Sequence, residues 1–425
     1  MAQGDSAMSS NSPWEVEQIG KVCVSIVPGR NKPKEFSGSI PWVTTPEITS
    51  RYIPGKNQTL YLSDYWINEA GAKKVPSGSV IIACVGDLGL VAIATEEVVL
   101  NQQLHAFVCP PSVHNEYCAY ALEGQKAYMY KIASTTTIPY LNKTNCESIN
   151  IPLPPLPEQK AIADLLSTWD EAIEKNERLI DAKQRRFRWL LCSLISDQCS
   201  MNDEKAEWKK VKLGEVCKVI TSNVDKKTSP DETPVLLCNY MDVYKNFYIT
   251  KGLDFMSASA TDGEIEKYQL RVHDVLLTKD SETPDDIANS ACVLDAPETL
   301  LCGYHLAILR PKKTLFGPYL NFALHTPRIR YEFSRQANGA TRFGLTMSAY
   351  NMVELPLPPV NEQKAIAAAL TASQHEIDLL KQLAEKYKTQ KRGLMQKMLT
   401  GEWRVKSVII DQFANFSEKQ QMNNE

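Results

Sequence analysis

The sequence lacks the motifs of the common active sites. It has no glycine-rich phosphate loop, no G-x-S-x-G turn and no H-E-x-x-H helix. Its three Pro-Pro pairs follow Cys109, Leu153 and Leu357, so none forms the Asn/Asp-Pro-Pro-aromatic motif of amino-methyltransferases. The six histidines are dispersed along the chain. These absences favour a binding or scaffolding protein over an enzyme.

Long apolar runs and paired cysteines are also absent. No stretch reaches the roughly 18 apolar residues that a membrane helix needs. The polar start of the chain lacks the basic and apolar regions of a signal peptide, and we expect residues 1–13 to form a flexible tail. The 11 cysteines include no C-x-x-C pair and none beside a histidine at ligand spacing. This scatter argues against a disulfide or metal framework, and it predicts a reducing cytosol.

Charge and length limit the remaining options. The 425 residues exceed one ordinary core, so two domains are expected. The composition, 43% hydrophobic and 23% charged, is typical of a folded protein. The net charge of −3 counts slightly against nucleic acid, so any basic surface has to be local.

One segment occurs twice. Ile151–Ala163 reads I-P-L-P-P-L-P-E-Q-K-A-I-A, and Leu355–Ala367 reads L-P-L-P-P-V-N-E-Q-K-A-I-A. The prolines keep the chain extended up to a helix start, where Pro157 suits the first helical position and Asn361 can act as a cap. The glutamates that follow favour the positive end of the helix dipole.

Apolar residues after both copies alternate at spacings of four and three, which predicts a coiled-coil seam. Each helix needs a partner to bury this stripe, and the other copy is the obvious one. Polar residues interrupt the seam at Asn176, Lys183, Ser373 and Lys391. The predicted seam residues are Ile162, Leu166, Trp169, Ile173 and Ile180 in the first helix, and Ile366, Leu370, Ile377, Leu380 and Tyr387 in the second.

The duplication extends upstream of the helices. Trp14-x5-Gly20-x-Val-Cys opens the first half and Trp208-x5-Gly214-x-Val-Cys the second. Strand-like runs follow in each half, at 80–82 and 104–108 and at 275–277 and 306–309. Residues 201–207 are polar, and we expect them to form a hinge between the halves. The predicted order is a tail at 1–13, globular domains at 14–154 and 201–357, long helices at 155–200 and 358–402, and a C-terminal tail at 403–425.

Together these features resemble the specificity subunit of type I restriction–modification systems. The matching segments are the two helix openings, the helix end Lys391–Gly401, and Asp274–Ile287 and Gly339–Leu345 in the second domain. The resemblance extends from about Trp14 to Arg404. It implies an α+β fold with two mixed α/β target recognition domains, two long antiparallel coiled-coil helices and a pseudo-twofold internal repeat.

The resemblance also implies a function. Each globular half is expected to recognise one half of a bipartite asymmetric site in double-stranded DNA, with the helices setting the gap between the halves. The helices are expected to dock two modification (methyltransferase) subunits, which restriction/translocase subunits join. S-adenosylmethionine, ATP and Mg²⁺ are expected on those partners, with no cofactor on this chain. The subunit itself is not an enzyme, and we expect it in a bacterial or archaeal cytosol. A coiled-coil scaffold that binds protein, without a DNA role, is the alternative.

This sequence departs from the family pattern in its first half. The first helix ends in R-R-F-R-W-L-L-C rather than the K-R-G-L-M type found at Lys391. The Gly-x-Thr-Arg signature is also missing, because Thr137 aligns with Thr341 but Ile138 stands opposite Arg342. We therefore expect the two halves to recognise different half-sites.

Candidate DNA contacts follow from residue type and position. Arg342 suits phosphate or a guanine edge, and Asn101 and Gln102 suit adenine. Lys279 and Ser281 lie in a polar loop after an apolar strand. Its acidic residues would repel phosphate, so either a Glu or Asp accepts a hydrogen bond from cytosine or the loop is purely structural. Tyr304 fits either a DNA contact or a buried strand start. The remaining candidates are Thr341, Thr137, Arg30 and Lys32.

Overall fold

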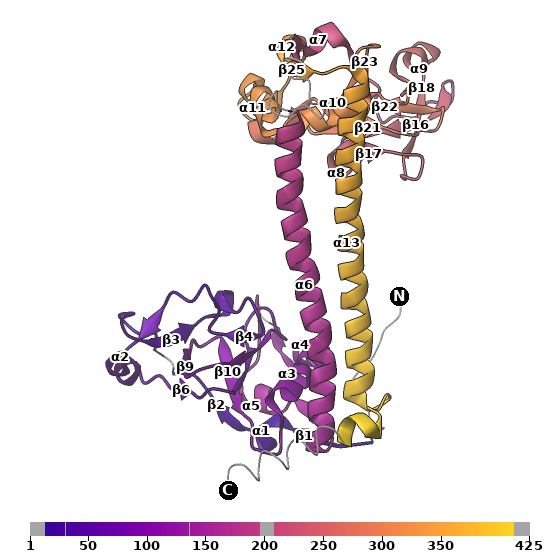
Figure 1. Ribbon diagram of the computed structural model, residues 1–425. Helices are drawn as coiled ribbons and strands as arrows, with labels where there is room; N and C mark the ends of the chain where they lie inside the picture. The colour runs from indigo at the N-terminus through magenta and orange to yellow at the C-terminus, as the bar shows by residue number, and fades with distance from the viewer. Residues whose placement is uncertain (1–12, 30, 136, 196–207, 412–425) are drawn as a thin grey trace. The chain divides into compact units, whose positions relative to one another are not determined.

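The computed structural model describes residues 13–29, 31–135, 137–195 and 208–411 (Figure 1). The predicted hinge at 201–207, residues 1–12 of the predicted tail and residues 412–425 lie outside the described residues. The chain divides into unit 1, residues 1–176 and 383–425, and unit 2, residues 177–382. Helices α6 (Leu156–Ile195) and α13 (Val360–Thr400) are both divided between the units, with one part of each helix in unit 1 and the other part in unit 2.

The globular part of unit 1 is built on two sheets. Their strand orders are β2-β10-β7-β8-β4 and β5-β3-β9-β6. The central strands are short runs of mainly β-branched and small apolar residues that are buried along most of their length, which suits a sheet covered on both faces. The bounds are β2 Val24–Ile26, β3 Ile40–Val43, β4 Tyr52–Ile53, β5 Tyr61–Leu62, β6 Lys74–Val75, β7 Val80–Ala83, β8 Val91–Ala94, β9 Val98–Leu100 and β10 Leu104–Val108.

Helix α3 (Asn115–Gly124) covers β7 and β8 and carries the buried Tyr117 and Tyr120 into the core. The other elements of this part are short: α1 Ile19–Val22, α2 Asp64–Glu69, α4 Lys126–Ile132, α5 Lys143–Glu147, a 3-10 helix at Thr45–Glu47, and the pairs β1 (Glu15–Gln18) with β13 (Asn150–Leu153) and β11 (Ser134–Thr135) with β12 (Pro139–Tyr140).

Unit 2 repeats this plan. Its sheets have the orders β15-β23-β19-β21-β17 and β18-β16-β22, and α10 covers β19 and β21. The strands are β14 Lys209–Lys212, β15 Cys217–Thr221, β16 Thr233–Cys238, β17 Tyr248–Ile249, β18 Met256–Ala260, β19 Val275–Thr278, β20 Asp280–Ser281, β21 Ser290–Val293, β22 Leu300–Cys302, β23 Leu306–Pro311, β24 Phe343–Gly344 and β25 Glu354–Leu357. The helices are α7 Leu213–Val216, α8 Tyr240–Lys245, α9 Asp262–Tyr268, a 3-10 helix at Pro284–Asp286, α10 Gly317–Leu324, α11 Pro327–Gln336 and α12 Met347–Met352.

The predicted α+β class with a repeated domain and two long helices is confirmed. None of the helices in the described part of the chain combines the length and the apolar character that a membrane crossing would need.

The repeated E-Q-K motif fixes the start of α6 to its globular domain. The buried Gln159 side chain accepts a hydrogen bond from the backbone N–H of His114 (2.8 Å). Its amide donates to the carbonyls of Ser112 (3.2 Å) and Pro154 (2.8 Å). Three bonds from one buried side chain explain why the motif needs glutamine here.

Gln363 does the same for α13. Its side chain accepts from the backbone N–H of Phe316 (2.7 Å) and donates to the carbonyls of Thr314 (2.9 Å) and Pro358 (2.7 Å). The duplicated motif is therefore a duplicated joint between helix and globular domain.

The start of α6 differs from the expectation in two details. The helix begins at Leu156, one residue before Pro157, because the N–H groups of Glu158 and Gln159 both bond to the Pro155 carbonyl. Glu158 does more than interact with the helix dipole. Its buried carboxylate binds the guanidinium of Arg404 through two bonds of 2.6 and 2.8 Å.

Within unit 1, the two helices pair antiparallel. Glu158 at the start of α6 meets Arg404 just beyond α13, and Asp170 further along meets Lys391. The rings of Trp169 and Tyr387 pack edge to face at 5.8 Å. Lys391 is thus an ion-pair partner rather than a mere interruption of the seam.

Within unit 2, Lys183 of α6 forms an ion pair with Glu376 of α13. Leu191 and Ile195 share one apolar cluster with Ile366 and Leu370. All ten predicted seam residues are at least half-buried in their own units. Six of them are buried, Ile162, Leu166, Ile180, Ile366, Leu370 and Ile377, and four are half-buried, Trp169, Ile173, Leu380 and Tyr387.

Removing the partner of Glu158 is expected to destabilise the protein. Arg404→Ala leaves a buried carboxylate without its ion pair, so the free energy of unfolding falls by about 1–3 kcal/mol. Arg392→Ala, at an exposed position of α13, is the control and changes little. Chemical denaturation of the purified chain measures both, and equal losses would contradict this role of Arg404.

A buried histidine predicts a pH dependence of stability. Burial lowers the pKa of His325 from 6.5 to about 4, and its ring bonds to the Ser290 carbonyl at 3.1 Å. The unfolded chain therefore binds more protons between these values. The contribution of neutral His325 to the free energy of unfolding is complete above pH 6.5. It is lost as the pH falls toward 4, which lowers that free energy by up to roughly 3 kcal/mol.

Thermal unfolding between pH 7 and pH 4.5 measures this contribution. His325→Gln is expected to flatten the profile, whereas His375→Gln, at an exposed position of α13, leaves it unchanged. A His325→Gln profile as steep as that of the wild type would refute the assignment.

Candidate nucleic-acid interface

Three loops meet at one edge of the main sheet in unit 2. They are residues 279–286 after β19, the turn 303–305 before β23 and the hairpin 338–345. The backbone N–H of Lys279 donates to the His305 carbonyl (3.1 Å), and the Leu345 N–H donates to the Lys279 carbonyl (3.0 Å). Lys279 thus joins all three loops at their base.

The hairpin has a tip that only glycine allows. Asn338 and Gly344 exchange two backbone hydrogen bonds of 3.0 and 2.9 Å. Between them Gly339 adopts φ +149°, and a Cβ there would lie 1.9 Å from the carbonyl oxygen of Arg342. Thr341 and Arg342, both predicted contacts, lie exposed on this tip.

One carboxylate binds the candidate Arg342 and the histidine next to the candidate Tyr304. Asp280 binds Arg342 through one oxygen (3.1 Å) and the His305 ring through the other (2.7 Å). The Arg342 side chain nevertheless stays 64% exposed. The acidic residue beside the predicted contact therefore positions the arginine.

Lys279 and Ser281 are engaged inside the loops. The Lys279 ammonium donates to the Ser222 carbonyl (3.0 Å) and lies 4.1 Å from the ring centre of Tyr304. Burial lowers the pKa of Lys279. Ser281 is buried and donates to the Thr283 carbonyl. Tyr304, 49% exposed, is the member of this group that faces outward.

Two tyrosines that the sequence analysis missed lie at the same edge. Tyr240 and Tyr244, one helical turn apart on α8, have rings stacked at 5.6 Å. Tyr244 is 44% exposed and donates to Asp286 in the loop after β19 (3.3 Å). The pKa of Tyr240 is raised, first by burial and then by Asp286. Their spacing of four residues was the available signal.

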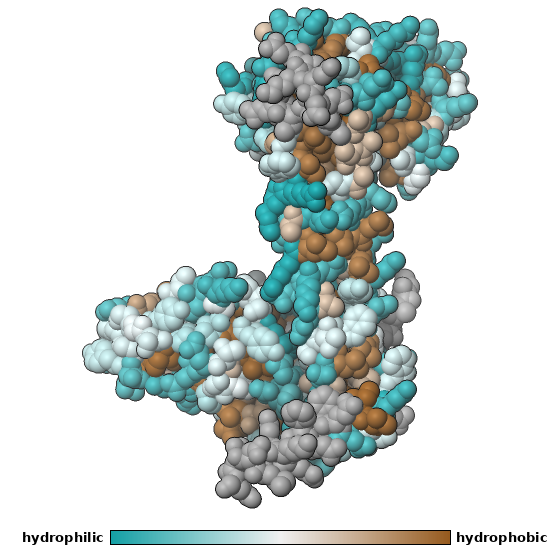
Figure 2. Space-filling model, in the orientation of Figure 1, coloured by the Kyte–Doolittle hydropathy of each residue, from teal (hydrophilic) through white to brown (hydrophobic). Residues whose placement is uncertain are grey.

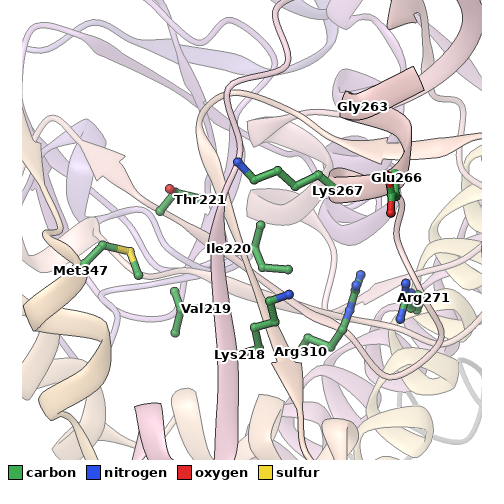
Figure 3. Close-up of a pocket in the computed structure, with 10 residues that line it drawn as sticks. All are labelled: Lys218, Val219, Ile220, Thr221, Gly263, Glu266, Lys267, Arg271, Arg310 and Met347. Carbon is green, nitrogen blue, oxygen red and sulfur yellow. The ribbon is translucent and has the colours of Figure 1, made fainter. Parts of the chain in front are cut away.

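A groove beside β15 has four cationic residues and one acidic residue, Glu266, in its lining (Figure 3). Its volume is about 850 Å³. Lys218 comes from β15, Lys267 from α9 and Arg271 from the following loop, and all three contribute to its lining. Arg310 also lines the groove but is bound by Asp274 (2.7 and 2.8 Å). The cations come from three separate segments of the sequence, around 218, 267–271 and 310, so no single charge run reveals the groove.

Unit 1 builds the same edge with different side chains. The Cys84 N–H donates to the Gln103 carbonyl (2.7 Å), and the Leu141 N–H donates to the Cys84 carbonyl (2.8 Å). These bonds match those of Lys279 in unit 2. The exposed Thr137 and Ile138 accordingly stand where unit 2 has Thr341 and Arg342.

The other predicted contacts of unit 1 lie on nearby loops. Gln102 is exposed on the turn before β10, at the position of Tyr304. The Asn101 side chain holds that turn, because its oxygen accepts from the Gln103 N–H (3.1 Å). Lys32 is exposed, 5.7 Å from the ring centre of Phe36. Arg30 lies outside the described residues.

Comparison with known proteins gives matches over most of the chain. The family model described as the type I restriction modification DNA specificity domain matches twice, over residues 11–184 and 205–388. The chain is 23% identical over 420 residues to the type I restriction enzyme MjaVIII specificity subunit of Methanocaldococcus jannaschii, covering 93% of this chain and 94% of that one. It is 27% identical over 289 residues to the putative MjaX specificity subunit of the same organism, covering 63% and 62%.

Two solved structures share the fold. The type I restriction–modification S subunit from M. genitalium superposes with a TM-score of 0.54 and 15% identity, covering 92% of this chain and 97% of that one. A chain from a study of complex assembly and conformational transition of the type I R–M system gives a TM-score of 0.59 and 18% identity, covering 93% and 100%.

The hairpin tip predicts different effects for two glycine substitutions. Gly339→Ala is expected to break the Asn338–Gly344 bonds, because its Cβ meets backbone and its φ is unfavourable, at a cost of about 1–3 kcal/mol. Gly344→Ala is the control, since its Cβ would meet only the Lys279 carbonyl at 3.9 Å. Hydrogen exchange of amides 338–345 measures the effect. Equal exchange rates in the two variants would show that the Asn338–Gly344 hydrogen bonds do not depend on the backbone conformation of Gly339.

Proposed function

This chain belongs to the family of type I restriction–modification DNA specificity subunits, and we propose that each of its globular halves recognises one part of a split DNA sequence. In this family the chain is the DNA-recognition subunit, and it is neither the methyltransferase nor the nuclease. The observation that carries the proposal is the loop edge built twice on one duplicated frame, with different exposed side chains in the two copies.

The edge in unit 2 supplies a cationic donor and aromatic surfaces. Arg342 offers the fork of N–H groups that suits the O6 and N7 atoms of guanine. Tyr304, beside Lys279, and Tyr244, bonded to Asp286, add two exposed rings at this edge. Thr341, beside the arginine on the tip, supplies a hydroxyl for a phosphate.

The edge in unit 1 supplies neutral groups instead. Gln102 at the turn offers a carboxamide suited to adenine, and Ile138 on the hairpin offers an apolar contact suited to a thymine methyl group. Thr137 and Lys32 are the candidates for phosphate. Unit 1 has Ile138 at the position where unit 2 has Arg342, which supports recognition of different bases by the two units.

Phosphate binding in unit 2 is assigned to the cationic groove. Lys218, Lys267 and Arg271 form a local positive surface on a chain whose net charge is −3. Binding through phosphates releases counterions, so affinity falls as salt rises.

The long helices are proposed as the docking site for two modification subunits, which restriction/translocase subunits join. Several apolar side chains on these helices stay exposed outside the seam, and apolar colour is visible along them in Figure 2. They are Leu165, Leu179, Trp189, Leu379 and Leu383. S-adenosylmethionine, ATP and Mg²⁺ are assigned to the partners, and the assembly to the cytosol.

Arg342 gives the sharpest test of DNA recognition. Arg342→Ala is expected to weaken binding of the cognate sequence by the complex with modification subunits, by about 1–3 kcal/mol, and to relax preference at one or two positions of a single half-site. Arg328→Ala, exposed on α11, is the control. An unchanged preference in a complex that still binds DNA would remove Arg342 from the interface.

The groove predicts a change in salt dependence. Lys267→Ala or Arg271→Ala should weaken binding to all sequences alike and reduce the slope of log affinity against log salt by about 1. Lys251→Ala, which removes an exposed cation elsewhere in unit 2, should leave the slope unchanged. Fluorescence anisotropy at four salt concentrations measures it. Identical slopes in all variants would place the phosphates elsewhere.

A further inference from the structure

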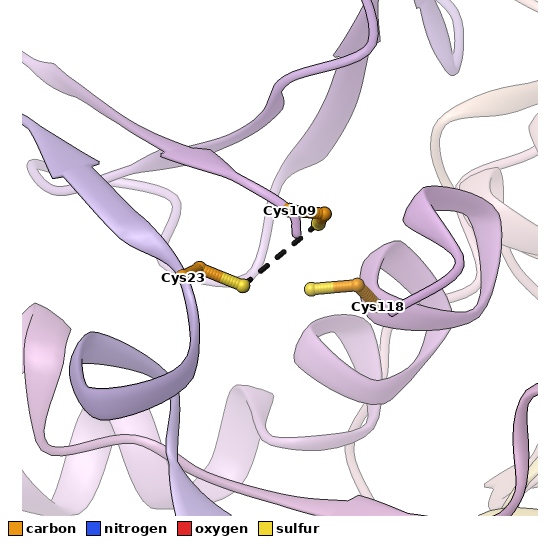
Figure 4. A group of neighbouring side chains, drawn as sticks. All are labelled: Cys23, Cys109 and Cys118. Carbon is orange, nitrogen blue, oxygen red and sulfur yellow. Dashed lines mark hydrogen bonds between the residues drawn. The ribbon is translucent and has the colours of Figure 1, made fainter. Parts of the chain in front are cut away.

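Three cysteines from distant parts of the sequence meet in the core of unit 1 (Figure 4). Cys23 follows α1, Cys109 follows β10 and Cys118 lies on α3. Their sulfur atoms all lie within 4.8 Å of one another, and those of Cys23 and Cys109 are 3.9 Å apart. Cys23 and Cys118 are buried and Cys109 is half-buried.

These separations suit a metal bound by thiolates. Zinc holds cysteine sulfur at about 2.3 Å in a tetrahedron, which places the sulfurs about 3.8 Å apart. The Cys23–Cys109 distance is already close to that value. Cys118 needs only a small side-chain movement to complete a set of three.

The duplicated frame does not itself require thiols at these positions. In unit 1 the strand register ends at the pair Val24–Val108, and Cys23 and Cys109 occupy the next position on either strand; in unit 2 Cys217 pairs with Pro311. Tyr117 donates to the Pro152 carbonyl, and Tyr319 donates to the carbonyl of the equivalent Pro356. The residues that follow these tyrosines, Cys118 and Leu320, are therefore equivalent too. Unit 2 thus packs the same site with one thiol and two apolar side chains.

One of the three cysteines, Cys109, borders an open pocket. An open pocket of about 380 Å³ is lined in part by Cys109, His114 and Lys160. The pocket brings solvent up to Cys109, the half-buried member of the set, and a buried metal site needs such an approach. Three thiolates around a divalent ion leave one net negative charge. Lys160, which lines the same pocket, offers a positive charge to offset it.

We propose that Cys23, Cys109 and Cys118 bind one Zn²⁺ ion as thiolates, with a solvent molecule from the adjoining pocket as the fourth ligand. Binding releases the three thiol protons to solvent and involves no oxidation. The ion cross-links the starts of β2 and α3 to the end of β10. It therefore stabilises unit 1 and has no counterpart at the equivalent place in unit 2.

Alkylation of the full-length, reduced chain tests the site without any substitution. Zn²⁺ alone, added after chelator treatment, is expected to slow iodoacetamide labelling of Cys109 at least tenfold. The exposed Cys192 on α6 is the internal control and keeps its rate. Peptide mass spectrometry resolves the two thiols. Equal rates for Cys109 with and without Zn²⁺ would overturn the proposal.

Zinc stoichiometry provides the second measurement. Cys84, His105 and Cys146 form another buried group within 4.8 Å, so the difference between variants is what counts. Cys109→Ser is expected to lose one equivalent of tightly bound Zn²⁺, and Cys217→Ser to lose none. The same zinc content in both variants would overturn the site. So would failure of Zn²⁺ to raise the thermal unfolding temperature of the wild type more than that of Cys109→Ser.

Discussion

The architecture depends on one buried side chain used twice. Gln159 and Gln363 each tie the first turn of a long helix to the loop before α3 or α10, with three hydrogen bonds apiece. A glutamine buried without those bonds would be costly, so the helix start and the loop fix each other. Because the joint is repeated, each globular domain is attached to its helix in the same manner.

The same frame presents different chemistry in its two copies. The backbone bonds that gather the three loops are equivalent around Cys84 and Lys279, yet the exposed side chains differ. The tip of one hairpin carries Ile138 and that of the other Arg342, which Asp280 orients. A conserved backbone arrangement with variable exposed residues allows recognition to change without altering the core.

Features set by local pattern could be predicted from the sequence. The long helices, the central strands and the correspondence of Thr137 with Thr341 all follow from periodicity and repetition. What could not be predicted depends on tertiary contacts. Lys279 and Ser281 turn inward because of partners that only folding brings near them. The same holds for the stacking of Tyr240 on Tyr244 and for the cationic groove. The thiols of Cys23 and Cys109 lie 86 positions apart, so their spacing carries no metal signal.

The central claim is that two independent halves recognise two parts of one DNA sequence. Its most direct test is to exchange residues 14–154 for the first globular domain of another family member, and to sequence the methylated sites made by the complex with modification subunits. We expect one part of the methylated sequence to change while the other part and the gap stay the same. A change in both parts, or in neither, would contradict it.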